Sequence, residues 1–351
     1  MSDVIVAPSI RDLDALSRDL AAWLGAKLPD ARDLRLTDVT YPRGAGQSHE
    51  TILFDAHWRQ AGEARSHGYV VRIKPTGYTM FPDNLFDEQY ALMRALHAHG
   101  AVRVAEPYWI EHDPAVLGAP FFLMEKMTGR VPVTVPRYAE SGWVADATPA
   151  QRRRMWTGAV RQLAAIQSLP TDALPFLAGP AHARDGLAQE LDKYARFVAL
   201  NLRDGDWPVL AAGLERLERT LPANQPAGLV WGDARMGNMM FDGDFDVVAV
   251  MDWEQPSLGG ALHDLAWFLQ MSAMHHDATA DRPFLAGMGT REETIDLWER
   301  ETGLSAADIG WYEDFTRLKL SCLSVRMAHL KGSTPPDAAW LARRLKVEPA
   351  L

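Results

Sequence analysis

An Asp-Gly dipeptide between two short apolar runs is the feature that most restricts the fold of this chain. The runs cover residues 239–241 and 247–251. Two such runs around an Asp-Gly turn are a strong signal for a β-hairpin. Antiparallel pairing brings together the residue that enters the first strand and the residue that leaves the second. The sequence therefore predicts that Asn238 and Asp252 lie side by side at the open end of the hairpin.

Three polar side chains are predicted to meet at this open end. The amide oxygen of Asn238 and the carboxylate of Asp252 are hard ligands that suit Mg²⁺ carrying nucleotide phosphates. Asp233 lies five residues before Asn238, on the loop that leads into the same end. Its carboxylate is placed to accept a proton from a substrate hydroxyl. An Asp base, a metal-binding Asn and a later metal-binding Asp follow one another in this order in kinase catalytic loops.

Aspartates in turns also occur in many proteins that bind nothing. Asp242, Asp244 and Asp246 are predicted to be turn residues only. They imitate the start of a calcium-binding loop, but Val247 stands where that loop requires glycine and Trp253 stands where it requires a bidentate glutamate. We therefore exclude a calcium loop.

The periodicity of the apolar residues changes along the chain. Spacings of three and four between Ile10 and Leu28 predict an amphipathic helix. Residues 35–74 contain short β-branched and aromatic runs, notably 51–54 and 69–73, which are typical of an antiparallel sheet. A helix over about 84–99 and strands at 109–110 and 121–124 follow. Residues 1–127 are thus predicted to form an N-terminal helix and a β-rich lobe.

Beyond a linker at 128–135 the pattern is mostly helical, apart from the hairpin. A capping box of Thr290 and Glu293 opens one of the late helices. Residues 128–351 are therefore predicted to form an α-rich lobe. The expected helices cover residues 151–168, 187–201, 209–220, 261–274, 290–302 and 306–330.

Together with Gly259 and Asp264-Leu265-Ala266, the stretch that contains Asp233, Asn238 and Asp252 resembles the aminoglycoside phosphotransferase and choline kinase superfamily, especially its bacterial phosphotransferases. The order of motifs agrees over about residues 35–330. The resemblance implies an α+β, protein-kinase-like fold of two lobes, with a small antiparallel β lobe and a larger α-helical lobe. It also implies an enzyme that uses ATP and Mg²⁺ to phosphorylate a hydroxyl of a small molecule, with Asp233 as the catalytic base.

The resemblance assigns nucleotide contacts in the N-terminal part of the chain. Gly44 and Gly46 precede a strand, where backbone N–H groups can approach phosphates, although a Gly-x-Gly alone also fits an ordinary turn. Alignment of Val70-Val71-Arg72 with the kinase strand makes Arg72 the phosphate-binding residue, with Lys74 as the second choice. Glu88, at the start of the next helix, is expected to pair with Arg72.

Three further residues are expected at the nucleotide. Glu125 and Met127 lie in a segment that resembles the hinge between the lobes, and their backbone groups are expected to bind adenine. Arg235 follows the base by two residues and is expected either to touch the γ-phosphate or an anionic acceptor, or to brace the loop through an ion pair.

Trp231 stands where the family usually has His before the Gly-Asp pair. By analogy that His organises the catalytic loop, and a Trp could do so through packing and its single N–H donor. The substitution leaves a second reading open, a catalytically silent regulator that binds a nucleotide. The presence of Asp233, Asn238 and Asp252 favours the enzyme, because a scaffold needs neither a base nor two metal ligands.

The acceptor is expected to be small. Eleven residues, 253–263, separate Asp252 from Asp264, which leaves no room for the activation segment of a protein kinase. Asp264 is predicted to anchor the loop backbone. Variable segments at 130–150, 185–205 and 271–330 would form the acceptor site, and an aminoglycoside or a hydroxyacyl-CoA thioester are both possible acceptors. Some aromatic and acidic side chains there could line the site or belong to the core and surface: Trp143, Tyr194, Trp311, Tyr312 and Glu313.

Composition excludes several other classes. The formal net charge is −10 and no basic tract is present, so a nucleic-acid partner is not expected. The chain contains no apolar stretch of 18 residues and no signal-peptide pattern. Neither membrane insertion nor secretion is therefore expected. The single cysteine, Cys322, fits the cytoplasm and is expected to be a buried small hydrophobe. His275-His276-Asp277 is predicted to be a solvated loop rather than a metal site. Nothing in the sequence predicts the oligomeric state.

Overall fold

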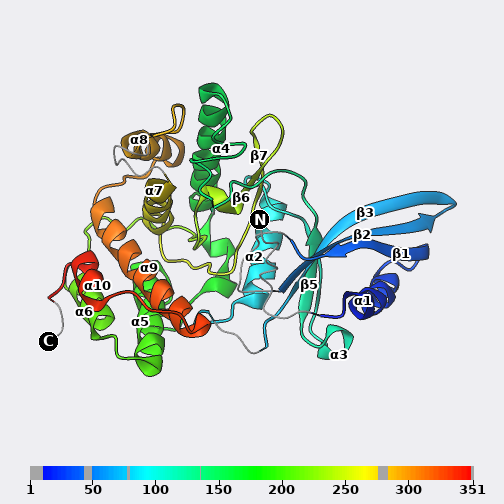
Figure 1. Cartoon of the computed structure of the whole chain (residues 1–351), viewed down its shortest axis with the longest axis horizontal. Helices are drawn as coiled ribbons and strands as arrows, with labels where there is room; N and C mark the ends of the chain where they lie inside the picture. The colour runs from blue at the N-terminus through cyan, green and yellow to red at the C-terminus, as the bar shows by residue number, and fades with distance from the viewer. Residues whose placement is uncertain (1–10, 43–49, 77–79, 135, 276–283, 349–351) are drawn as a thin grey trace. The chain divides into compact units, whose positions relative to one another are not determined.

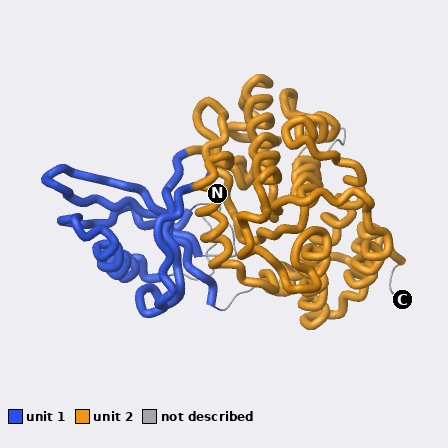
Figure 2. The backbone as a smooth tube through the Cα atoms, turned by 180° about the vertical axis from the view of Figure 1, so that it is seen from behind, with its two compact units in different colours: residues 1–79, 104–128 blue, residues 80–103, 129–351 orange. Residues whose placement is uncertain are grey.

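The computed structural model describes residues 11–42, 50–76, 80–134, 136–275 and 284–348 (Figure 1). The chain divides into two compact units (Figure 2). Unit 1 contains Met1–Thr79 and Val104–Thr128, and unit 2 contains Met80–Arg103 and Gly129–Leu351. These units differ from the predicted domains, 1–127 and 128–351, in that helix α2 (Phe86–His99) belongs to unit 2, where it contacts the short helix η2 (Pro175–Leu177).

Unit 1 is built on a five-stranded antiparallel sheet with the strand order β1-β2-β3-β5-β4. Its strands are β1 (Arg32–Thr40), β2 (Glu50–Gln60), β3 (Glu63–Ile73), β4 (Pro107–Glu111) and β5 (Phe121–Glu125). Alternate residues of β2 are buried, including Ile52, Phe54 and Ala56. This alternation is expected of a strand that has one face against a core.

Helix α1 (Leu13–Lys27) covers the core face of this sheet. Asp12 begins the helix by accepting hydrogen bonds from the backbone N–H groups of Asp14 and Ala15. The buried side chains of α1, among them Leu20 and Trp23, pack with residues of the strands and with the short helix α3 (Pro114–Leu117). The amphipathic helix predicted near the N-terminus is confirmed.

The β2–β3 hairpin is longer than the sequence predicts. The apolar runs at 51–54 and 69–73 do lie in these strands, but pairing continues to Gln60 and Glu63. Ala61 and Gly62, at the tip, have φ angles of 51° and 86°. Two positive φ angles match the right-handed twist of a hairpin, so the turn extends the pairing into a region where the side chains are mostly exposed.

Unit 2 consists mainly of helices. They are α2, α4 (Pro149–Gln167), α5 (Gly186–Asp204), α6 (Pro208–Glu218), α7 (Leu262–His275), α8 (Arg291–Thr302), α9 (Ile309–Lys331) and α10 (Ala338–Leu345), with short 3-10 turns η1 (Thr171–Ala173), η2 and η3 (Met236–Asn238). The predicted helices and the capping box at Thr290 are confirmed. Helix α10 was not predicted, because eight residues give too few apolar repeats. Its Leu341 and Leu345 complete a core with α5, α6 and α9.

The predicted hairpin is present as β6 (Met239–Phe241) and β7 (Val247–Val250). The Asp-Gly dipeptide lies inside a five-residue loop and does not form a two-residue turn. The Asp242 carboxylate accepts hydrogen bonds from the backbone N–H groups of Asp244 and Asp246, both at 2.9 Å. The residue with a positive φ is Phe245. These aspartates are turn residues, as predicted.

One other sequence expectation is met. Cys322 is a free thiol in the core, and burial raises its pKa. None of the helices formed by the described residues is long and apolar enough to cross a membrane.

Candidate active site

The loop that carries Asp233 is fixed by backbone contacts to the loop that contains Ser257. Val230 and Ser257 exchange two backbone hydrogen bonds, of 2.8 and 3.2 Å. Gly232 has a φ of 103°, and a Cβ atom there would lie 2.4 Å from the Gln255 carbonyl oxygen. Only glycine combines this backbone conformation with such a close approach. The residue before Asp233 is therefore glycine for a structural reason.

Asp264, at the start of α7, anchors the same loop. Its carboxylate accepts hydrogen bonds from the backbone N–H groups of Trp231 at 2.5 Å and Gly232 at 3.0 Å. The side chain is buried, and burial raises the pKa of the carboxyl to about 6, although the two backbone donors lower it. The prediction that Asp264 anchors the loop is confirmed.

Three donors hold the carboxylate of Asp233. Arg235 Nε and Asn238 Nδ2 donate to its Oδ2 at 3.0 and 2.6 Å, and Trp267 Nε1 donates to its Oδ1 at 2.8 Å. The side chain is 27% exposed, so solvent and ligands can still reach it. The carboxylate is thus oriented by its surroundings while one of its edges remains accessible.

Asn238 directly precedes β6 and Asp252 lies two residues after the end of β7, so both are at the open end of the hairpin. The Met251 backbone N–H donates to the Asn238 carbonyl at 2.9 Å. Both side-chain hydrogen bonds of Asn238 use its amide nitrogen and end on Asp233. Its amide oxygen is therefore the atom suited to a metal. Asp252 adopts a φ of 63°, which is uncommon for a residue with a side chain.

This pair of oxygen donors fits Mg²⁺. The ion binds through one or two protein oxygens and completes its coordination with phosphates and water. Over the described residues, no group of three or more His, Cys, Asp or Glu side chains could hold a metal by itself.

Trp231 braces the loop in the manner expected from the sequence. Its indole N–H donates to the carbonyls of Met251 at 2.9 Å and Asp252 at 3.2 Å. The ring is fully buried against Trp253, with ring centroids 5.5 Å apart. The Trp therefore connects the loop of the base to the segment that carries Asp252.

Trp267 is a residue that the sequence reasoning missed. It lies on α7 three residues after Asp264, so both side chains project from the same helix face. Asp264 reaches the backbone of Trp231 and Gly232, and Trp267 reaches the carboxylate of Asp233. The spacing of three in Asp264-Leu265-Ala266-Trp267 was the available signal.

Arg235 braces the loop. Besides its bond to Asp233, its Nη1 donates to the Thr134 hydroxyl at 3.0 Å. Of the two roles left open for Arg235, this is the one with contacts in the structure, and its contact with a phosphate or an anionic acceptor stays a prediction.

The other residues predicted to bind the nucleotide lie in both units. Arg72 is buried on β3, on the same face as Val70, and Glu88 lies in the first turn of α2. Because Arg72 belongs to unit 1 and Glu88 to unit 2, their ion pair stays a prediction. Glu125 ends β5 and Met127 follows it, while Gly44 and Gly46 lie outside the described residues.

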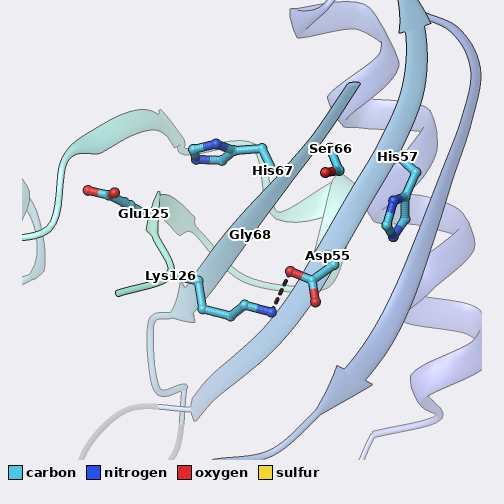
Figure 3. A pocket seen from close by; sticks show the side chains of 7 residues that line it. All are labelled: Asp55, His57, Ser66, His67, Gly68, Glu125 and Lys126. Carbon is cyan, nitrogen blue, oxygen red and sulfur yellow. Dashed lines mark ion pairs between the residues drawn. The ribbon is translucent and has the colours of Figure 1, made fainter. Parts of the chain in front are cut away.

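Unit 1 also contains a polar pocket of about 450 Å³ on the β2–β3 hairpin (Figure 3). The Lys126 side chain passes over Gly68 to form an ion pair with Asp55. Of the predicted site residues that the structure describes, only Glu125 lines this pocket. Its complete lining is Asp55, His57, Ser66, His67, Gly68, Glu125 and Lys126.

The side chains considered for the acceptor site are buried, packed against other rings or held in an ion pair. Tyr194 and Tyr312 are buried, and Trp311 packs against the latter and Phe315. Trp143 packs on Phe245, and Glu313 pairs with Arg291. His275 ends α7 and stacks on Tyr138, whereas His276 and Asp277 lie outside the described residues.

The geometry of the loop agrees with the comparison with known families. The profile of the phosphotransferase enzyme family matches residues 44–304, which include Asp233, Asn238, Asp252 and Asp264. The chain belongs to this family. The resemblance inferred from the motifs is thereby confirmed.

The curated relatives of this phosphotransferase are longer proteins that are named as acyl-CoA dehydrogenases. It is 28% identical over 243 residues to the probable acyl-CoA dehydrogenase IBR3 of Arabidopsis thaliana, which covers 66% of this chain and 27% of the relative. It is 25% identical over 315 residues to human acyl-CoA dehydrogenase family member 11, covering 84% of this chain and 38% of the relative. The chain thus spans well under half the length of these relatives.

Solved structures establish the fold. A protein of Ralstonia eutropha JMP134, provisionally described as an aminoglycoside phosphotransferase, has a TM-score of 0.65 and 21% identity, covering 94% of this chain and 93% of its own. Amicoumacin kinase hAmiN, in complex with AMP-PNP and Ca²⁺, has a TM-score of 0.55 and 15% identity, covering 96% and 95%. The predicted α+β, kinase-like fold is therefore confirmed.

Proposed function

We propose that this phosphotransferase transfers the γ-phosphoryl group of Mg-ATP to a hydroxyl group of a small molecule. The observation that carries the proposal is the carboxylate of Asp233, held by three donors, one of which is the side chain of the predicted metal ligand Asn238. A base oriented beside a two-oxygen metal site is the arrangement that phosphoryl transfer requires. The AMP-PNP bound to the amicoumacin kinase supports ATP as the donor.

Asp233 would orient the acceptor hydroxyl and take its proton late in the transfer. Its Oδ2 already accepts two hydrogen bonds, whereas Oδ1 accepts one from Trp267. Oδ1 therefore has more room for the hydroxyl proton. Asn238 and Asp252 would hold Mg²⁺, which when bound neutralises charge on the phosphoryl oxygens. Arg72 on β3 stays a predicted phosphate ligand, because its guanidinium can bind two oxygens at once.

The bracing by Trp231 favours this enzyme over a silent nucleotide-binding regulator. The indole hydrogen bonds to Met251 and Asp252 supply the order that the usual His would give the loop. A scaffold that only binds a nucleotide has no need of a base held by three donors.

For the acceptor we propose two classes. The names of the curated relatives, which are acyl-CoA dehydrogenases, point to a hydroxyacyl-CoA thioester. Several solved structures with this fold are aminoglycoside phosphotransferases, one of them solved with gentamicin, and the acidic net charge of this chain would tolerate such a cationic acceptor.

The first test is release of ADP from Mg-ATP in the presence of hydroxyacyl-CoA thioesters, aminoglycosides and other hydroxylated metabolites. An acceptor-dependent release that disappears in the Asp233→Asn variant would support the proposal and identify the acceptor class. Absence of Mg-dependent ATP binding would contradict it.

Replacement of Trp267 by Phe should lower kcat about 10-fold with little change in the KM for ATP. The change removes the donor to Asp233 Oδ1 and keeps an aromatic ring in place, and one hydrogen bond to a charged group contributes about 1.5–3 kcal/mol. Steady-state kinetics would measure the effect. Trp156→Phe is a matched control, because it removes the indole hydrogen bond to Thr294, away from the loop. Equal losses in the two variants would argue against a role of Trp267 at the base.

Turnover should decline as the pH falls through about 6, the pKa to which burial raises Asp264. Protonation weakens the acceptor for the backbone N–H groups of Trp231 and Gly232. The stability contribution has the opposite sign. Because the folded pKa lies above the ordinary value of 3.8, this group favours the folded state at low pH and loses that contribution as the pH rises through about 6.

Profiles of kcat and of the unfolding temperature against pH would separate the two effects of Asp264. In Asp264→Asn, whose single oxygen cannot serve both donors equally, kcat should be low throughout and the limb near pH 6 should be missing. A variant profile that keeps the wild-type limb would assign it to another group.

A further inference from the structure

A buried ion pair joins helices α5 and α9 of unit 2, which pack against each other (Figure 1). Lys319 Nζ donates to Glu190 Oε2 at 2.5 Å, and the two side chains are 5% and 1% exposed. The aromatic rings of Tyr194 and Phe315 lie 4.8 and 4.9 Å from the ammonium. The pair is thus enclosed within the helical core.

The carboxylate of Glu190 is held in its ionised form. Burial by itself would raise the pKa of Glu190, but the nearby ammonium groups of Lys319 and Lys193 outweigh it and keep the pKa below its ordinary value. A buried ion pair can often be replaced by well-packed apolar side chains of similar volume without loss of stability. Stability alone therefore does not account for charged groups at this place.

Helix α5 uses this cluster to hold the loop of residues 255–259. Ser257 Oγ donates to the second carboxylate oxygen of Glu190 at 2.5 Å, and Lys193 Nζ donates to the Gln255 carbonyl at 2.9 Å. The Leu258 backbone N–H donates to Gln189 Oε1 at 2.7 Å. A Cβ atom on Gly259 would lie 2.2 Å from Glu190 Cγ, so the loop lies directly on this side chain.

The same loop touches both parts of the candidate active site. It begins three residues after Asp252 in the chain. It pairs with Val230 through the backbone of Ser257, and its Gln255 carbonyl lies against Gly232, next to Asp233. A shift of the 255–259 loop would therefore displace the base and the metal ligand together.

We infer that Glu190, fixed by Lys319, is a positioning residue that sets the places of Asp233 and Asp252 through Ser257 and the 255–259 loop. The inference rests on the proposed function, in which these two aspartates carry out phosphoryl transfer. Neither Glu190 nor Lys319 contacts the reacting groups. Their effect on catalysis passes through the loop.

The mildest test is Ser257→Ala, which removes one hydroxyl and leaves the ion pair in place. We expect kcat to fall about 10-fold and the Mg²⁺ concentration for half-maximal rate to rise. The unfolding temperature should fall moderately, because the buried Glu190 Oε1 and the Gly259 N–H lose their partner. Ser321→Ala is the matched control. Its hydroxyl is equally buried but donates within α9 to the Arg317 carbonyl. If Ser257→Ala matched this control in kcat and Mg²⁺ dependence, the inference would be overturned.

The double variant Glu190→Leu/Lys319→Met separates positioning from stability. It replaces both members of the ion pair by apolar side chains, so no uncompensated carboxylate remains, and Ser257 loses its acceptor. Loss of the Glu190 carboxylate also lowers the pKa of Lys193 further, so this buried amine can lose its proton and still donate to the Gln255 carbonyl. Lys319→Met alone leaves Glu190 without its closest partner and should unfold at lower temperature. We expect the double variant to recover stability while kcat stays at least about 10-fold low. Recovery of wild-type kcat together with stability would contradict the inference.

Hydrogen exchange of residues 229–233 provides a readout that needs no turnover. The amides of Val230 and Trp231 do not bond to the Ser257 hydroxyl, so their exchange reports the position of the loop. We expect exchange at least about 10-fold faster in Ser257→Ala than in Ser321→Ala. If the unaltered chain phosphorylated no acceptor, the proposed function would fail, while equal exchange in these two variants would refute the positioning by the network.

Discussion

Asp233→Asn should lower kcat about 1000-fold while the dissociation constant for Mg-ATP changes less than about 3-fold. General-base catalysis contributes about 10²–10⁴-fold, and an amide cannot take the acceptor proton. The amide is the same size as the carboxylate, and its single oxygen can still accept from Arg235 and Asn238, while its NH2 group then faces the indole N–H of Trp267. Turnover by ADP release and nucleotide affinity by isothermal titration would measure the two quantities.

Asp244→Asn is the appropriate control for this variant. It makes the same chemical change on an exposed residue in the loop at the other end of the β6–β7 hairpin. Its kcat should equal that of the unaltered protein. If Asp233→Asn retained normal turnover, the assignment of the base would be wrong, and the carboxylate would have to be regarded as structural.

Asp252→Ala should weaken the binding of Mg-ATP at least about 10-fold and abolish most of the turnover. Loss of a partner in the outer shell of a metal site already reduces metal affinity about 10–100-fold, and a direct ligand should matter no less. Asn238 alone would then face the cation with one neutral oxygen. Titrations of ATP with and without Mg²⁺ would measure the loss.

The magnesium dependence is the decisive part of this experiment. Without Mg²⁺, the variant should bind ATP no more weakly than the unaltered protein, because removal of a carboxylate only relieves repulsion from the phosphates. Asp244→Ala should behave like the unaltered protein in both titrations. An equal loss of affinity with and without Mg²⁺ would show that Asp252 acts on the fold and not as a metal ligand.

Much of the fold could be predicted because its signals are local. The spacing of apolar residues gave the helices of unit 2, since a buried helix face repeats every three or four residues. The β2–β3 hairpin was predicted too short, because its outer part is held by the turn at Ala61 and Gly62 and not by burial. Helix α10 was missed because a short helix leaves too little periodicity.

Some residues of the candidate site could be predicted from the sequence, and others were visible only in the structure. Asp233, Asn238 and Asp252 could be named from the sequence because a hairpin brings its two ends together whatever surrounds it. Trp267 could have been named only by asking which side chain shares a helix face with Asp264. Arg235 was left between two roles, and the contact that gives it the bracing role comes from Thr134, 101 residues away.

The sequence by itself determined the family and the fold class and predicted the order of base and metal ligands, because these depend on short spacings along the chain. The tertiary structure alone decided what holds those residues in place. Trp267 contacts Asp233, which lies 34 residues away along the chain, and Lys319 contacts Glu190, which lies 129 residues away. Such contacts form only when helices pack, and their partners are chosen by burial and by the need to satisfy every buried charge.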